Sequence, residues 1–100
     1  MANNNRKGYT VPQQYVLSKK TSSLDLGSAY FFVVKNSVTG NTVDVEIEGC
    51  GTFATLLAGE DFRFESSSPD YPFRENAQLK INFFSGDSTV TVTIFYVRYE

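Results

Sequence analysis

Residues 29–48 read AYFFVVKNSVTGNTVDVEIE, and they carry the clearest fold signal in the chain. Residues 29–35 form a continuous aromatic and β-branched run, which has the length of a strand buried on both faces. Residues 42–48 alternate strictly between apolar and polar side chains, as in a strand with one buried and one solvated face. Residues 36–41 (NSVTGN) supply turn chemistry between the two. The sequence therefore predicts two strands that pair as a hairpin.

Further strand signals lie on both sides of this stretch. The other predicted strands cover residues 15–17, 62–65, 77–84 and 89–99, and residues 52–58 form either a strand or a short connection. Gly86 and Asp87 suit a tight hairpin turn, and residues 21–27 and 66–76 read as loops. No segment shows the 3.6-residue periodicity of a helix. About seven short strands predict an all-β fold, a single antiparallel β-sandwich with immunoglobulin-like or jelly-roll-like strand order.

The alternation also predicts which side chains fill the space between the sheets. The expected core residues are Phe32, Val34, Val43, Val45, Ile47, Phe62, Phe64, Leu79, Ile81, Phe83, Val92 and Ile94. Apolar residues make up 41% of the chain and aromatic residues 15%. This content is sufficient for one domain of 100 residues to form a packed core.

The absence of certain residue types limits the chemistry. The chain has no His and no Trp, and Cys50 is its single cysteine. Histidine-based catalytic triads, zinc fingers and internal disulfides are therefore excluded. We expect no enzyme, no catalytic residues, no metal site and no cofactor. No stretch approaches the roughly 20 apolar residues of a membrane helix, and no signal peptide is expected, so the predicted place of synthesis is the cytoplasm.

Charge is divided unevenly along the chain. Residues 1–24 contain four bases and no acid, whereas residues 25–100 contain eleven acids and five bases. Residues 1–13 are polar and lack an apolar pattern, which predicts a flexible, basic N-terminal arm on a β-sandwich domain of residues 14–100. Four scattered bases on an acidic body do not predict specific nucleic-acid binding.

The last predicted strand carries an unusual outward face. If Val92, Ile94 and Tyr96 face the core, then Phe95, Val97 and Tyr99 face away from it. Large apolar groups at the end of a strand face need cover, either from this chain's loop 66–76 and arm or from a neighbouring subunit. With the arm included, the predicted interface residues are Arg6, Lys7, Tyr9, Phe95, Val97 and Tyr99.

Other residue groups have weaker functional interpretations. Asp44, Glu46 and Glu48 share one strand face and are a solvated row, part of a divalent-cation site, or a surface along which a partner's basic arm lies. Cys50 stands between two glycines without a histidine to activate it, which favours a buried or turn cysteine.

The sequence resembles small β-sandwich virion proteins of tailed bacteriophages. The resemblance rests on the polar, basic start MANNNRKGYTVPQQ, the element LLAGEDFRF at residues 56–64 and the closing stretch INFFSGDSTVTVTIFYVRYE at residues 81–100. It implies a non-catalytic structural subunit, a capsid decoration, auxiliary or fibre-associated protein located in the virion. Its partners would be a capsid or tail protein lattice and copies of itself as a homo-oligomer, with no membrane. The alternative is a carbohydrate- or receptor-binding module with exposed tyrosines such as Tyr71.

Overall fold

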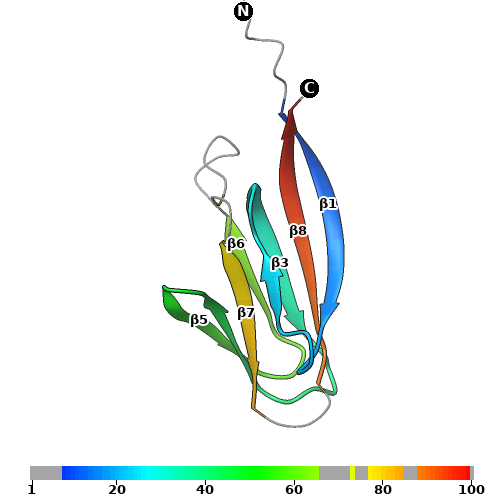
Figure 1. The fold of residues 1–100 in the computed structure, drawn as a ribbon. Helices are drawn as coiled ribbons and strands as arrows, with labels where there is room; N and C mark the ends of the chain where they lie inside the picture. Colours follow the sequence, from blue (N-terminus) through cyan, green and yellow to red (C-terminus); the bar gives the residue numbers. More distant parts are fainter. Residues whose placement is uncertain (1–7, 66–72, 74–76, 85–87, 100) are drawn as a thin grey trace, which may run out of the picture.

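The computed structural model describes residues 8–65, 73, 77–84 and 88–99, with side chains described for 12–65, 73, 77–84 and 88–96 (Figure 1). The strands are β1 (Gly8–Leu17), β2 (Ser23–Asp25), β3 (Ala29–Asn36), β4 (Val43–Ile47), β5 (Gly51–Leu56), β6 (Asp61–Glu65), β7 (Gln78–Phe83) and β8 (Val90–Tyr99). They form two antiparallel sheets of four strands each. The predicted fold class, a single antiparallel β-sandwich, is confirmed.

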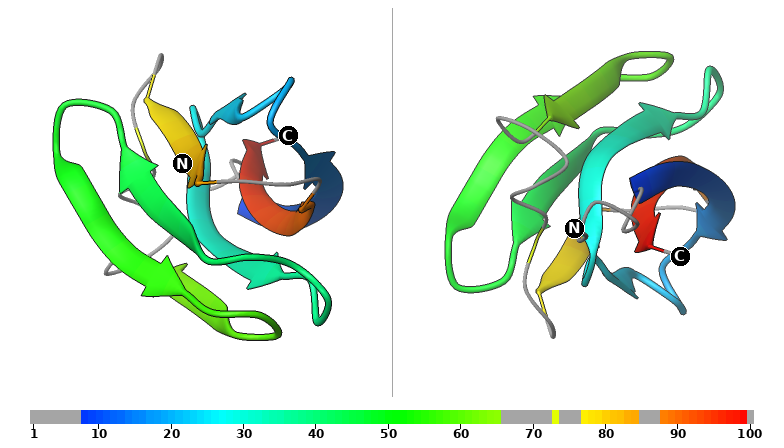
Figure 2. Two further views of the ribbon diagram at one scale, coloured as in Figure 1. Left: turned by 90° about the horizontal axis from the view of Figure 1, so that it is seen from below. Right: turned by 90° about the horizontal axis from the view of Figure 1, so that it is seen from above.

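The strand order is that of a jelly roll. Sheet A has the order β1-β8-β3-β6, and sheet B has the order β2-β7-β4-β5. Each strand pairs with its counterpart from the other end of the chain, so that β1 pairs with β8, β2 with β7, β3 with β6 and β4 with β5. The chain is thus a long double strand, folded at the β4–β5 turn and rolled into two layers. Figure 2 shows these layers along the strand direction.

Two glycines form the turn at the centre of this folded chain. Gly49 has a φ of 86° and Gly51 a φ of 85°, a backbone region that L side chains rarely adopt. The backbone N–H of Cys50 donates to the carbonyl of Ile47 at 2.8 Å and closes the turn. The Cys50 side chain is exposed, so the cysteine is a turn residue rather than a buried one.

Both hairpins predicted from turn chemistry are wrong. β3 lies in sheet A and β4 in sheet B, so residues 37–42 cross from one sheet to the other. β7 and β8 also lie in different sheets, and the predicted turn residues Gly86 and Asp87 fall outside the described residues. Turn residues allow the chain to reverse, but they do not decide whether the next strand pairs with the previous one or crosses the core.

Asn36 anchors the crossing loop between β3 and β4. Its side chain is fully buried, and its Nδ2 donates to the carbonyls of Asn41 at 2.8 Å and Leu56 at 3.2 Å. Its backbone N–H donates to the carbonyl of Glu60 at 2.9 Å. The Asn41 N–H donates to Ser88 Oγ at 2.6 Å. Because these groups come from different loops and strand ends, their hydrogen bonds hold both sheets together at this end.

The predicted core is largely confirmed. Of the predicted residues, Phe32, Val34, Val43, Val45, Ile47, Leu79, Ile81, Val92 and Ile94 are buried, while Phe62, Phe64 and Phe83 are partly buried and pack against them. Val90, on the predicted inward face of the last strand, is buried as expected, whereas Leu17, Leu26, Ala29 and Leu56 are also buried and were not predicted. They lie at strand ends or in short segments, where too few residues alternate to reveal an inward face.

The strand count and the N-terminal boundary differ from the prediction. β2 lies inside the predicted loop 21–27, so the described part has eight strands rather than about seven. Residues 8–13, predicted as part of the arm, belong to β1 and pair with β8 from Gly8↔Tyr99 to Gln13↔Ile94. β1 is an edge strand and is held to β8 by backbone hydrogen bonds along one side only. This pairing does not require alternating apolar side chains, so the mostly polar residues 8–13 show no strand pattern in the sequence.

Replacing Ile81 by alanine should lower the free energy of unfolding by about 2–5 kcal/mol, because Ile81 is 1% exposed and the cavity would lie between the sheets. The matched control is Lys80→Ala on the exposed face of the same strand, expected within about 0.5 kcal/mol of the unmodified protein. Urea denaturation measures both, and equal midpoints for the two variants would show that Ile81 is not a core residue.

Candidate functional site

The outer face of sheet A contains an aromatic pair on its two central strands. Phe95 on β8 lies opposite Phe31 on β3, and their ring centroids are 5.1 Å apart at 34°. Both side chains are partly exposed. Pro12 on β1 lies on the other side of Phe95 in the same cross-strand row. The row is therefore apolar across three neighbouring strands.

The next row of this face is neutral at its centre. Val33 on β3 lies between Thr93 on β8 and Arg63 on β6, and Thr93 lies beside Gln14 on β1. The Gln14 side chain donates to Thr93 Oγ1 at 3.5 Å. Val33 and Thr93 are partly exposed. We define the outer A face as Pro12, Gln14, Val16, Phe31, Val33, Lys35, Asp61, Arg63, Glu65, Thr91, Thr93 and Phe95.

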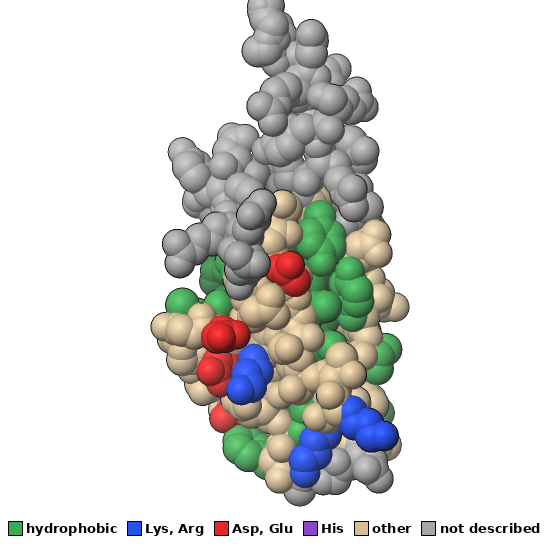
Figure 3. Space-filling view, in the orientation of Figure 1, with side chains coloured by type: hydrophobic (Ala, Val, Ile, Leu, Met, Phe, Trp, Pro, Cys, Tyr) green, Lys and Arg blue, Asp and Glu red, His purple; other side chains and the backbone are tan. Residues whose placement is uncertain are grey.

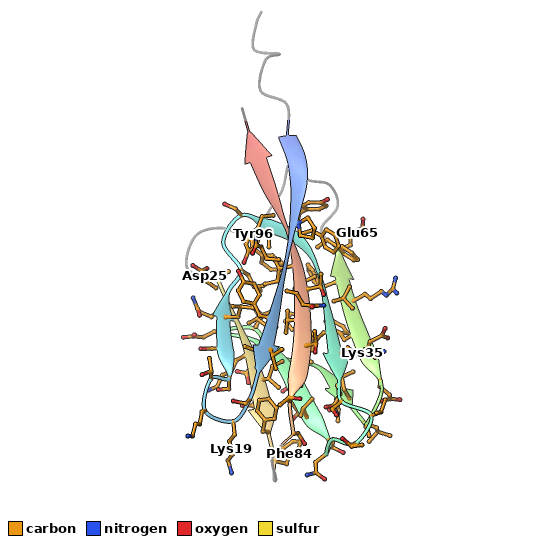
Figure 4. All side chains as sticks on the ribbon, turned by 90° about the vertical axis from the view of Figure 1, so that its right-hand side faces the viewer. Lys19, Asp25, Lys35, Glu65, Phe84 and Tyr96 are labelled. Atoms are coloured by element: carbon orange, nitrogen blue, oxygen red, sulfur yellow. The ribbon has the colours of Figure 1, made fainter. Side chains whose placement is uncertain are left out.

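The charges of the outer A face balance and lie toward one side. Its described acids and bases are Asp61, Glu65, Lys35 and Arg63, so their formal sum is zero. Three of the four belong to the edge strand β6. Figure 4 shows Lys35 and Glu65 along the β3–β6 side, away from the centre of the molecule. The middle of the face thus carries no formal charge.

The outer face of sheet B is acidic. It contains Asp25, Asp44, Glu46 and Lys80, and Glu48 follows at the end of β4, so four acids stand against one base. Figure 3 shows acidic side chains on the left of the molecule, the side of sheet B. The two faces of the sandwich therefore differ clearly in charge and in apolar character.

The acid row on β4 is engaged in hydrogen bonds across strands. Asp44 Oδ1 accepts from Thr55 Oγ1 at 2.6 Å, and Glu46 Oε1 accepts from Asn82 Nδ2 at 2.7 Å. Within the described residues, no group of three or more His, Cys, Asp or Glu side chains is arranged to hold a metal ion. The carboxylates of Asp44 and Glu46 are therefore bound to neighbouring strands of sheet B.

The ladder between β1 and β8 continues beyond the end of β3. The last pair of β3 with β8 is Ala29↔Tyr96, whereas β1 and β8 continue to Gly8↔Tyr99. The two strands project above the rest of the sandwich in Figure 1. A two-stranded ribbon alone is at best marginally stable, so this projection gains from any surface that packs against it.

The predicted interface residues have different positions. Phe95 lies on the outer A face, and Tyr9, Val97 and Tyr99 belong to the projecting part of β1 and β8, although their side chains are not described. Arg6 and Lys7, as well as Tyr71, lie outside the described residues. Cover from loop 66–76 is visible only at Phe73, which packs against Phe32 and Phe64 with ring centroids 6.0 and 5.2 Å apart, on the inner side.

The sequence did not reveal Phe31 and Val33 as members of this face. Their run was interpreted as buried on both faces, but β3 buries only Ala29, Phe32, Val34 and Asn36 and leaves the alternate residues partly or fully exposed. The sequence did contain a sign of this outward face. Lys35 is spaced by two residues from Val33 and by four from Phe31, so all three share one face, and a lysine on that face is not expected in a strand buried on both sides.

The free edges of both sheets are poorly suited to pairing with another strand. In sheet A, β1 carries Pro12, which lacks an N–H, and β6 presents alternating charged side chains. In sheet B, β2 has three residues, and β5 has a bulge at Phe53. Short strands, prolines, charges and bulges all oppose edge-to-edge pairing. An interface is therefore better placed on a sheet face than on an edge.

Comparison with known proteins assigns no family. No protein-family model and no curated protein matches the chain. Among solved structures, the chain is similar to the core of the Drosophila NLP, at 16% identity and a TM-score of 0.47 over 92% of this chain and 100% of that chain. The structure of that core is described as giving insight into pentamer formation and histone binding. In the described part of this chain, no helix is long and apolar enough to cross a membrane.

The prediction of a phage virion subunit is contradicted by this comparison. The matched structure is that of a pentamer-forming, histone-binding core, not of a capsid or tail protein. The features that suggested a virion protein, a polar start and compact strands with a closing hairpin, describe a type of sandwich rather than a function.

Deleting residues 1–12 should destabilise the fold by roughly 1–3 kcal/mol, because the deletion removes the β1 half of the pairs from Gly8↔Tyr99 to Pro12↔Phe95. Deleting residues 1–7 is the control and should leave the urea midpoint unchanged. If both deletions unfold at the midpoint of the full chain, residues 8–12 are an arm and not part of sheet A.

Proposed function

We propose that this chain is a self-associating protein-binding module, whose copies bind one another through the outer A face. The observation that carries the proposal is the apolar row of Pro12, Phe95 and Phe31 on a face with no net formal charge. Aromatic residues are enriched in interface cores, and charged residues are depleted there. The proposed role is binding, and the chain carries out no reaction itself.

Electrostatics favour the outer A face over the opposite face for contact between identical chains. In a symmetric pair, each charge on a contact surface is present twice. The outer face of sheet B, with four acids and one base, would meet a second surface of the same negative sign. Like charges brought together in an interface are unfavourable. The outer A face meets a second copy without net repulsion.

The size of the face is sufficient for a specific contact. Four strands about 4.8 Å apart, with ladders of five to ten residues at about 3.4 Å per residue, outline roughly 300–650 Å² in projection. A standard interface buries about 800 Å² of accessible surface per partner, and the accessible surface of a pleated face exceeds its projection. Each 100 Å² of apolar surface removed from water contributes about 2.5 kcal/mol.

A lysine at position 93 should abolish this association. Thr93 lies at the centre of the face between Gln14 and Val33, so a lysine there has no charged side chain directly opposite it in the monomer. In the pair it would be an unpaired charge in the contact, and the dissociation constant should rise at least about a hundredfold, or about 2.7 kcal/mol. Sedimentation velocity across a concentration series measures the effect.

The matched control is Thr52→Lys, the same change on exposed β5 of sheet B, which should leave association intact. Urea midpoints of both variants separate a folding defect from an association defect. The proposal is wrong if the unmodified protein stays at its monomer mass of 11.2 kDa at all concentrations, or if both lysine variants associate equally well.

A further inference from the structure

One end of the sandwich, the lower end in Figure 1, carries most of the large apolar side chains that the described part of the chain exposes. The strands β1, β3, β5 and β7 end there, and the chain passes into its connecting segments. Of the five exposed large apolar side chains in the described residues, four belong to this end, namely Val16, Val38, Leu57 and Phe84. Val16 is part of the outer A face, whereas the other three lie in or beside the connections.

Hydrogen bonds hold two of these connections in place. The Gly59 N–H donates to the carbonyl of Ser37 at 3.0 Å, which joins the β5–β6 turn to the β3–β4 loop. Within the β5–β6 turn, the Leu57 N–H donates to Glu60 Oε1 at 2.8 Å, and the Glu60 N–H donates to the Leu57 carbonyl at 3.0 Å. The backbone is thus fixed on both sides of Val38 and Leu57, whose side chains are 75% and 56% exposed.

Two lysines lie at the same end. Lys19 and Lys20 are exposed in the β1–β2 loop, where the Ser18 N–H donates to the Thr21 carbonyl at 3.1 Å. Figure 4 shows Lys19 and Phe84 together at the lower end of the molecule. Among the described residues, neither lysine side chain has an ion-pair partner. We define the lower tip as Lys19, Lys20, Val38, Leu57 and Phe84.

The described acids near the lower tip have partners within the chain. Glu60 accepts the hydrogen bond from the Leu57 N–H, and Asp61 lies opposite Lys35 in the β3–β6 ladder. Asp87, in the β7–β8 connection, lies outside the described residues. The two lysines of the lower tip therefore present positive charge that no described acidic side chain neutralises.

A lipid surface suits this arrangement better than a protein surface does. The apolar side chains project singly from different connections, and polar residues such as Ser37 and Thr39 separate them. The core of a protein interface is a contiguous, closely packed apolar patch. Fluid lipid can instead surround each projecting side chain separately, and lysines beside inserted apolar groups are attracted to anionic headgroups.

We infer that the lower tip binds the surface of a membrane that contains anionic lipids. Val38, Leu57 and Phe84 enter the headgroup region, and Lys19 and Lys20 contact the negatively charged headgroups. Contact of this kind lies on a membrane and does not cross it. The inference goes beyond the proposed self-association and does not depend on it, because the lower tip shares no residue with the outer A face. It replaces the expectation of no membrane partner, which the phage resemblance implied.

Single tryptophans can report on this contact, because the chain contains no Trp. The two probes are Phe84→Trp at the lower tip and Phe53→Trp on β5, an exposed aromatic position away from the tip. Each full-length variant is mixed with phosphatidylcholine vesicles that contain about 30% phosphatidylserine, or with vesicles of phosphatidylcholine alone. Phe84→Trp emission should shift to shorter wavelength with the anionic vesicles and be quenched by brominated acyl chains, whereas Phe53→Trp emission should not change.

Substitutions at the lower tip should weaken binding to the anionic vesicles, measured by co-sedimentation. Leu57→Ser should raise the dissociation constant roughly tenfold, because it removes an inserting apolar group. Lys19→Gln combined with Lys20→Gln should raise it by about tenfold or more and reduce its dependence on salt. Lys80→Gln, the same change on the exposed face of sheet B, is the control and should bind as the unmodified chain does. Urea midpoints verify that each variant is folded.

Three results would overturn the inference. The first is that the unmodified chain does not bind the anionic vesicles, or binds equally well to phosphatidylcholine alone. The second is equal quenching of the two tryptophans by brominated lipid. The third is protection of Phe84→Trp from acrylamide that rises with protein concentration in the absence of vesicles, because a protein surface would then cover the lower tip. Self-association is decided separately, by sedimentation of the Thr93→Lys variant.

Discussion

The pairing of β8 on both sides is the constraint on which the rest of the structure depends. β1 binds one edge of this strand and β3 the other, so that β8 is central in sheet A although it ends the described chain. Its even residues Val90, Val92 and Ile94 are fully buried and face sheet B. The period of two then forces Thr91, Thr93 and Phe95 to the outside. One strand thereby determines both the core and the proposed contact face.

The rolled-up arrangement explains why the two faces differ. In the jelly roll, the alternating acidic row of β4 and the balanced charges of β3 and β6 fall in different sheets, because the chain crosses between sheets after β3 and again after β5. The acids are therefore collected on sheet B, where Thr55 and Asn82 bind two of them. Sheet A keeps the aromatic pair at its centre, with three of the four charges of its outer face on the edge strand β6 and the fourth, Lys35, on β3. A face with this distribution suits contact with a protein surface.

The sequence predicted well what depends on alternation and poorly what depends on long-range pairing. The inward face of residues 42–48 was correct, because Val43, Val45 and Ile47 alternate with acids over a full strand. The hairpin to residues 29–35 was wrong, since the crossing is held by Asn36, whose hydrogen bonds to Asn41 and Leu56 follow only from the folded chain. Phe95 was correctly placed on the outward face, but its neighbour Phe31 was not recognised, because a continuous apolar run hides which of its sides is outward.

The most direct test of the account is the solvent accessibility of the Val33 methyl groups in the unmodified protein. NMR with a soluble gadolinium chelate measures the relaxation of methyl protons exposed to water, and Val38 is a suitable reference because it is 75% exposed in the β3–β4 loop. If copies associate through the outer A face, the Val33 methyl groups are protected at high protein concentration and become accessible on dilution, whereas Val38 is accessible throughout. Relaxation of Val33 that does not change with protein concentration would contradict the account.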